Sequence, residues 1–173
     1  MSAPVASLIG DGSRLHLQHG PIDLVIGAES TRVGDRRCAF EAAAARFDSV
    51  LGELVAELPL LRAQTTMVSD RPMGKIARHM DAAGRPHAHN IFVTPMAAVA
   101  GAVADEVLAA MLSGQTPRKA YVNNGGDIAF HLNNGAVFDV QGPAGRVQIT
   151  ANDRSRGIAT SGWQGRSHSL GIA

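Results

Sequence analysis

The chain has 173 residues, of which 45% are hydrophobic, and its formal net charge at pH 7 is +1. This length suits one domain with a sizeable core, and a charge so close to neutral gives no global field that would attract nucleic acid or an anionic membrane. The one cysteine, Cys38, cannot form an internal disulfide, and residues 1–13 lack the basic and apolar regions of a signal peptide. We therefore expect a cytoplasmic protein in which residues 1–173 form a single domain, with no nucleic-acid or membrane partner.

The first third of the sequence predicts a β-hairpin followed by a long helix. Residues 14–18 and 22–26 alternate between polar and apolar side chains on either side of a turn at His19-Gly20-Pro21, as a half-buried hairpin does. From Asp35 to Leu58 the apolar residues recur at helical spacing. Pro59 is expected to end this helix, because the residue before a proline is pushed out of the helical region. Residues 60–68 are then predicted to form a strand.

Residues 71–89 combine arginines, a lysine and three histidines, and a short helix is predicted over residues 73–83. His87 and His89 would lie on one face of a strand and could bind a metal, but no third ligand is in register, so solvated histidines are the favoured interpretation. The basic residues could meet a phosphate, but Asp70 and Asp81 accompany them. A mixed, solvated face is therefore the favoured interpretation, and no metal site is predicted.

The next segment predicts a second long helix, from Pro95 to Leu112. Thr94 is a suitable N-cap, proline favours the first turn, and Gly114 lies just beyond the end. The helix is rich in alanine and contains Gly101, so it could lie close to a sheet or accept the flat face of a ligand. Its amino end would suit a phosphate or carboxylate, and a core helix without a ligand is the alternative.

The stretch from Tyr121 to Phe130 interrupts two apolar runs with Asn123, Asn124, Gly125, Gly126 and Asp127. The glycines permit positive φ angles and close approach of a ligand, and the carboxylate can accept hydrogen bonds from ribose hydroxyls or a ring N–H. A tight turn without a ligand and a binding site both remain open.

After this stretch, apolar runs separated by turns predict an antiparallel meander over residues 128–132, 136–140 and 146–151, with a last strand at residues 157–159. Strands that follow a long helix in this way indicate an α+β fold with an antiparallel sheet and two long packed helices. Thr160, Ser161, Gly162 and Trp163 come next, and they offer hydroxyls and an aromatic ring to a ligand. We expect this run to lie beside residues 123–127, because a shared pocket needs convergent polar groups.

Three segments carry a family resemblance: FVTPMAAVAGAVADEVL from Phe92, YVNNGGDIAFHL from Tyr121 and RGIATSGWQGRSHSLGIA from Arg156. They resemble an uncharacterised bacterial and archaeal family related to ApbE, the flavin transferases that move FMN from FAD onto a protein. In the transferases, the counterparts of Gly101 with Asp105, of residues 123–128 and of residues 160–162 surround the FAD.

The resemblance implies an ApbE-like fold, as part of a duplicated T-fold-like arrangement, with a pocket for FAD or FMN. It yields no catalytic residue. The ligand-binding candidates are Thr94, Met96, Asn123, Asn124, Gly125, Gly126, Asp127, Thr160, Ser161, Gly162 and Trp163.

Two positions depart from the transferase pattern. The transferases usually carry a lysine before the helix glycine, where this chain has Ala100. Their magnesium site also uses a later D-A-x-x-T run, and this sequence ends at Ala173 without one. Either the chain is cut short at its C-terminal end or the metal site is missing, so magnesium is expected only in a longer parent chain.

The leading hypothesis is an ApbE-like protein that binds a flavin nucleotide or a related phosphorylated heteroaromatic, with FMN-transferase chemistry left open. The alternative is a non-catalytic accessory or binding protein in sulfur or cofactor metabolism, which Ala100 favours. A structural oligomerisation domain is a third hypothesis, disfavoured by the dense polar runs. A small-molecule nucleotide is the expected partner, and a homo-oligomer is left open.

Overall fold

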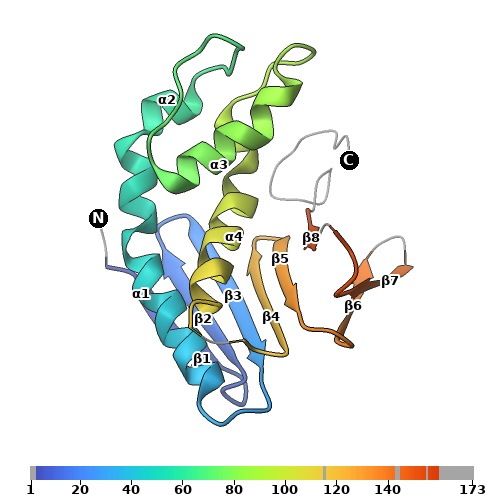
Figure 1. Cartoon of the computed structure of the whole chain (residues 1–173). Coiled ribbons are helices and arrows are strands. Elements are labelled where there is room, and N and C mark those ends of the chain that lie inside the picture. The colour runs from blue at the N-terminus through green and yellow to red at the C-terminus, as the bar shows by residue number, and fades with distance from the viewer. Residues whose placement is uncertain (1–2, 115, 143–144, 155, 160–173) are drawn as a thin grey trace.

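The computed structural model describes residues 3–114, 116–142, 145–154 and 156–159. It has the expected α+β architecture, in which helices cover one face of an antiparallel sheet (Figure 1). The sheet has six strands in the order β1-β2-β3-β4-β5-β8. Their bounds are β1 Val5–Ile9, β2 Arg14–His19, β3 Ile22–Glu29, β4 Lys119–Asn124, β5 Asp127–Leu132 and β8 Gly157–Ile158.

The predicted hairpin is confirmed as β2 and β3, which pair in antiparallel register from Arg14 opposite Gly27 to His19 opposite Ile22. Alternate residues of both strands, such as Leu17 and Leu24, are buried beneath the helices. All the helices follow β3 in the sequence, and the next strand, β4, then pairs with β3 in antiparallel register. Strands distant in sequence are thereby joined in one sheet.

The first long helix, α1, spans Asp35–Ala56 and is two residues shorter than predicted. Pro59 does not end it. Instead, this proline occupies the first turn of a short helix, α2 (Leu58–Arg62), where its missing N–H leaves no hydrogen bond unmade. The strand predicted over residues 60–68 is wrong, because the first of these residues continue α2 and fully bury Leu61 against the core.

The short helix predicted near residues 73–83 is present as α3 (Lys75–Gly84), followed by the 3-10 helix η1 (Arg85–His87). Glu57, which lies between α1 and α2, anchors the amino end of α3. The Glu57 carboxylate accepts hydrogen bonds from the backbone N–H groups of Met73 and Gly74, both at 2.7 Å. These two N–H groups come just before the first helical residue, and a carboxylate near this end of the helix also complements the helix dipole.

The second long helix begins later than predicted. Residues Pro95–Ala98 form a 3-10 turn, η2, and the α-helix α4 runs from Val99 to Met111. Thr94 has the extended backbone of an N-cap, but its side chain makes no capping hydrogen bond. The α-helical amino terminus therefore lies one turn beyond the predicted position.

Only the first strand of the predicted meander, β5, belongs to the main sheet. Strands β6 (Val137–Gly142) and β7 (Gly145–Thr150) form a separate two-stranded sheet, so the prediction of a single sheet is wrong for these two strands (Figure 1). Aromatic packing explains the departure. Phe138 of β6 lies 4.9 Å from the ring centroid of Phe130 and 6.0 Å from that of Tyr121, and together they form part of a second hydrophobic cluster.

A buried carboxylate joins the three main helices. Glu106 of α4 is 5% exposed, and its side chain meets Nε of Arg46 from α1 and Nζ of Lys75 from α3, each at 2.9 Å. Burial by itself raises the pKa of the Glu106 carboxyl. The hydrogen bonds from Arg46 and Lys75 outweigh it, so the net shift of the pKa is downward.

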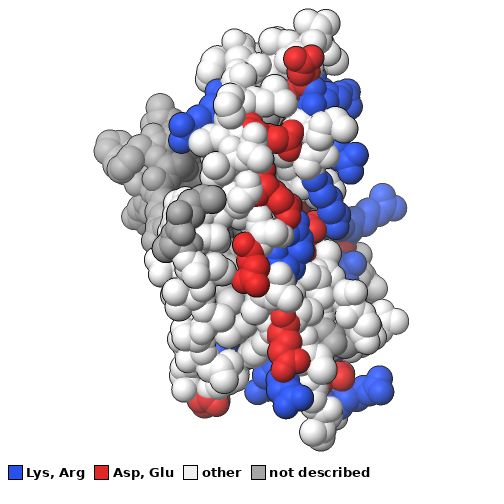
Figure 2. All heavy atoms as spheres, turned by 90° about the vertical axis from the view of Figure 1, so that its left-hand side faces the viewer, with Lys and Arg blue, Asp and Glu red and all other residues white. Residues whose placement is uncertain are grey.

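Charges on the side of the molecule formed by α1 are mixed. Figure 2 shows acidic and basic side chains interspersed along this face rather than gathered by sign. No helix among the described residues is long and apolar enough to cross a membrane.

Replacing Gly27 by alanine is expected to lower the free energy of unfolding by about 1–3 kcal/mol. A Cβ at this position would lie 2.5 Å from Cε1 of Tyr121, whose ring is braced by Phe138. Chemical denaturation would measure the loss. The double variant G27A/Y121A should lose less than the sum of the two single variants, and strict additivity would show that the ring does not cause the clash.

Replacing Glu106 by glutamine is expected to cost about 1–3 kcal/mol of stability at pH 7, because it removes the buried charge that pairs with Arg46 and Lys75. The cost is limited because Arg46 keeps its ion pair with Glu53 and Lys75 is half exposed. A carboxyl with a lowered folded pKa stabilises the fold above its unfolded pKa, near 4.5, and that contribution disappears as the pH falls through the folded pKa. The gap between wild type and variant should therefore close in acid.

Urea denaturation between pH 7 and pH 3 would follow this gap. Glu41→Gln is the matched control, since Glu41 forms an exposed ion pair with Arg37 and its loss should cost little at any pH. If the stability difference between wild type and Glu106→Gln did not change with pH, the lowered pKa of Glu106 would be contradicted.

Candidate functional site

The run Asn123–Asp127 forms the tight turn between β4 and β5. Gly125 and Gly126 are its two central residues, with φ angles of 62° and 109°. Positive φ at both positions is what a two-residue hairpin turn of this twist requires, and glycine adopts it without strain. The Asn123 side-chain oxygen accepts a hydrogen bond from the Gly126 N–H at 2.9 Å. Turn chemistry thus accounts for part of this polar run.

The remaining polar groups of the turn face the helices. Asn124 and Asp127 pair across the two strands and lie on the same sheet face as Val122 and Ala129, which are buried against the helical layer. Nδ2 of Asn124 donates a hydrogen bond to the backbone oxygen of Ala100 in α4, at 3.1 Å. Two of the three segments of the ApbE-like pattern therefore meet in space (Figure 1).

The accessible stripe of α4 begins next to this contact. Residues 101, 105 and 109 of α4 recur every four positions and continue from residue 97 of η2, and all four are at least partly exposed. A Cβ added at Gly101 would meet none of the described atoms within 4 Å, so the helix surface there is open. Partial burial by neighbouring atoms raises the pKa of the Asp105 carboxyl even though the residue is exposed, and His79 of α3 opposes the shift. We call residues 123–127 with Gly101 and Asp105 the turn–helix surface.

The remaining ligand-binding candidates are Thr94, Met96 and residues 160–163, and none of them is seen to join the turn–helix surface in the described part of the chain. Thr94 is partly buried just before η2, and Met96 packs against the hydrophobic core. Residues 160–163 lie outside the described residues, so their predicted neighbourhood stays a prediction. The described chain ends close to the turn, because Ile158 of β8 pairs with Ile128 of β5.

The interpretation of residues 71–89 requires two corrections. His87 lies in η1 and His89 in the turn after it, so the predicted strand face with two imidazoles does not exist. Asp81 and Arg85 form a buried ion pair, so the prediction that the charged residues of this segment are all solvated is wrong for these two. Their spacing of four on a helical segment was the available signal. Within the described residues, no group of three or more histidine, cysteine, aspartate or glutamate side chains could hold a metal ion.

Comparison with known proteins identifies the family. A search of curated proteins finds no match to the chain. The sequence profile of the family described as "AbpE bacteria" matches residues 6–173, which is nearly the whole chain. The protein therefore belongs to the AbpE bacteria family.

Proposed function

We propose that the protein binds a flavin nucleotide, FAD or FMN, or a related phosphorylated heteroaromatic, at the turn–helix surface. The observation that carries the proposal is the hydrogen bond from Asn124 to the Ala100 carbonyl. It holds the hairpin turn against α4 at the point where the helix surface opens at Gly101. Two segments that resemble the flavin-binding segments of ApbE transferases thereby form one continuous surface.

The chemistry of the surface suits a flat ligand that carries hydroxyl groups. Within the described part of the chain, no atom lies close to where a Cβ of Gly101 or Gly125 would be, so a ring system could approach the backbone closely. Asp127 begins β5 beside this space, and its carboxylate is an acceptor for ribose hydroxyls or a ring N–H.

The residues favour a protein that binds the flavin nucleotide but does not transfer FMN. The transferases usually place a lysine where this chain has Ala100, and an alanine side chain offers no cation to a phosphate. The Ala100 carbonyl is also engaged by Asn124. A non-catalytic accessory or binding protein in sulfur or cofactor metabolism is therefore the second candidate.

Gly101→Leu should weaken FAD binding at least tenfold, because the new side chain would fill the open surface of α4. The fold should tolerate it, since a glycine in a helix interior costs about 1 kcal/mol relative to better helix formers. Titration of FAD fluorescence would give the dissociation constants. Gly52→Leu is the matched control, because Gly52 lies in α1 and also faces open space. Equal affinities for the two variants would contradict the proposed location.

Asp127→Ala should weaken flavin binding more than His87→Ala or His89→Ala. Loss of the charged acceptor would leave ligand donors unpaired, at a cost of about 1–3 kcal/mol. The measurement is a titration with FAD and with FMN, each with and without magnesium, alongside thermal melts to confirm folding. The absence of saturable flavin binding under every condition would mean that the protein uses a different ligand. Mass spectrometry of a candidate acceptor protein would test transfer separately.

A further inference from the structure

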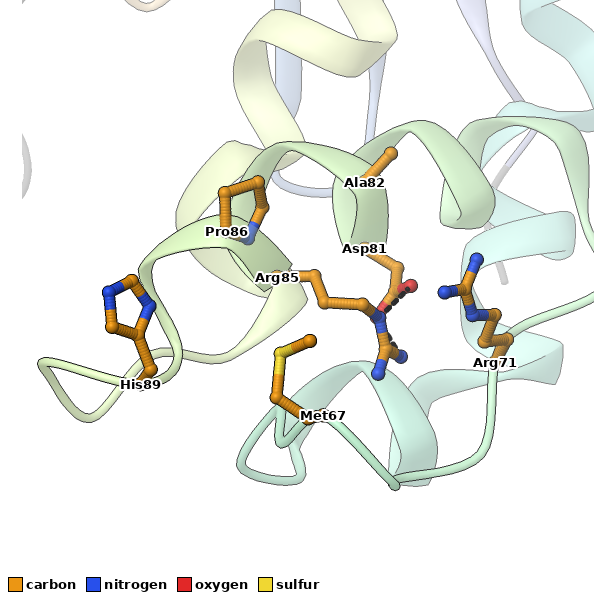
Figure 3. A pocket seen from close by; sticks show the side chains of 7 residues that line it. All are labelled: Met67, Arg71, Asp81, Ala82, Arg85, Pro86 and His89. Atoms are coloured by element: carbon orange, nitrogen blue, oxygen red, sulfur yellow. Dashed lines mark hydrogen bonds and ion pairs between the residues drawn. The ribbon is translucent and has the colours of Figure 1, made fainter.

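A cavity lies away from the turn–helix surface, between α3 with η1 and the loop that joins α2 to α3. Its volume is about 530 Å³, within the range of small-molecule sites. Figure 3 shows the residues that line it: Met67, Arg71, Asp81, Ala82, Arg85, Pro86 and His89. None of them belongs to the turn–helix surface, so this cavity needs an explanation of its own.

The buried pair Asp81 and Arg85 provides the cavity with a rigid polar base. Nε and Nη2 of Arg85 donate to the two carboxylate oxygens of Asp81, at 2.9 and 2.7 Å. The remaining donors of Arg85 reach the backbone oxygens of Thr66 and Ser69, which fixes the loop that carries Met67. Because the pair is electrically balanced and its polar groups are engaged, it contributes shape rather than a free charge.

The surplus charge of the cavity belongs to Arg71. Among the described residues, its guanidinium makes no hydrogen bond or ion pair, and the side chain is exposed. Figure 3 shows it extending toward the Asp81–Arg85 pair, with His89 at the opposite side of the cavity. A guanidinium presents a planar fork of donors that matches a carboxylate or phosphate.

The space between these two ends is mostly apolar. Met67, Ala82 and Pro86 line it, and Met67 is 69% exposed although it carries a thioether side chain that is usually buried. An unbranched methionine adapts to ligands of different outline. The cavity therefore combines a hydrophobic wall with one uncompensated cation.

We propose that this cavity binds a small organic anion with an apolar body. The carboxylate or phosphate of the ligand pairs with Arg71, and its apolar part lies against Met67, Ala82 and Pro86. The site is separate from the proposed flavin site and does not depend on it.

Benzoate and phenyl phosphate are suitable probes, with benzyl alcohol as the uncharged analogue and acetate as the anion without an apolar body. Calorimetric or NMR titration of the full chain should show that at least one of the aromatic anions binds tenfold or more tightly than benzyl alcohol and acetate. If neither aromatic anion does so, the proposal is overturned.

Two variants locate the binding. Arg71→Gln should weaken binding of the aromatic anion by about tenfold or more, as expected for loss of a charge-assisted hydrogen bond. Arg78→Gln is the matched control, because it removes the same charge from an exposed position on α3 that does not line the cavity. If both variants weakened anion binding equally, the effect would come from the net charge of the protein and not from Arg71, and the proposal would be overturned.

Ala82→Leu tests the apolar part of the site. Ala82 is exposed on α3, so a larger side chain should fill the cavity without disturbing the core, and it should abolish binding while the melting temperature is kept. Unchanged binding in this variant would place the ligand elsewhere. Gly101→Leu, which blocks the turn–helix surface, should leave the affinity for benzoate and phenyl phosphate unchanged, and this separates the two proposals.

Discussion

The carboxylate of Glu106 is the constraint on which the helical layer depends. A buried charge is costly unless it is paired, and here the partners come from two other helices, Arg46 of α1 and Lys75 of α3. Together with the buried apolar residues of α4, such as Val103 and Val107, this pairing orients the helix so that Gly101 and Asp105 lie on its accessible side. The hairpin turn meets the helix next to Gly101, at the carbonyl of Ala100.

Local patterns were enough to predict most of the fold, and tertiary packing explains where they failed. The period-two alternation around Leu17 and Leu24 and the helical stripe of α1 reflect burial on one face, which a sequence displays directly. The separation of β6 and β7 from the main sheet depends on Phe138 meeting Tyr121 and Phe130, a contact between strands that no local pattern specifies. The same holds for Arg85, whose burial requires a distant loop to fold over it.

The candidate site was predictable in part for a similar reason. Paired glycines between two apolar runs indicate a turn with positive φ, and this is what Gly125 and Gly126 form. The docking of that turn on α4 was not visible in the sequence, because the contact joins a side chain to a backbone carbonyl, which every residue type possesses. The position of Thr94 and Met96 depended on where the α-helix begins, and helix boundaries are set by hydrogen bonding in the final structure.

The contact between Asn124 and Ala100 also makes the turn sensitive to chemical ageing of the protein. Asparagine followed by glycine is the dipeptide most prone to deamidation, since the glycine backbone nitrogen can attack the side-chain carbonyl carbon without steric hindrance. This attack expels ammonia and leaves a succinimide, which water opens to aspartate or isoaspartate. Conversion of Asn124 to aspartate would exchange the donor Nδ2 for a second oxygen, which would face the Ala100 carbonyl as one acceptor against another. A covalent change of one atom, with no substitution in the gene, would thus release the hairpin turn from α4.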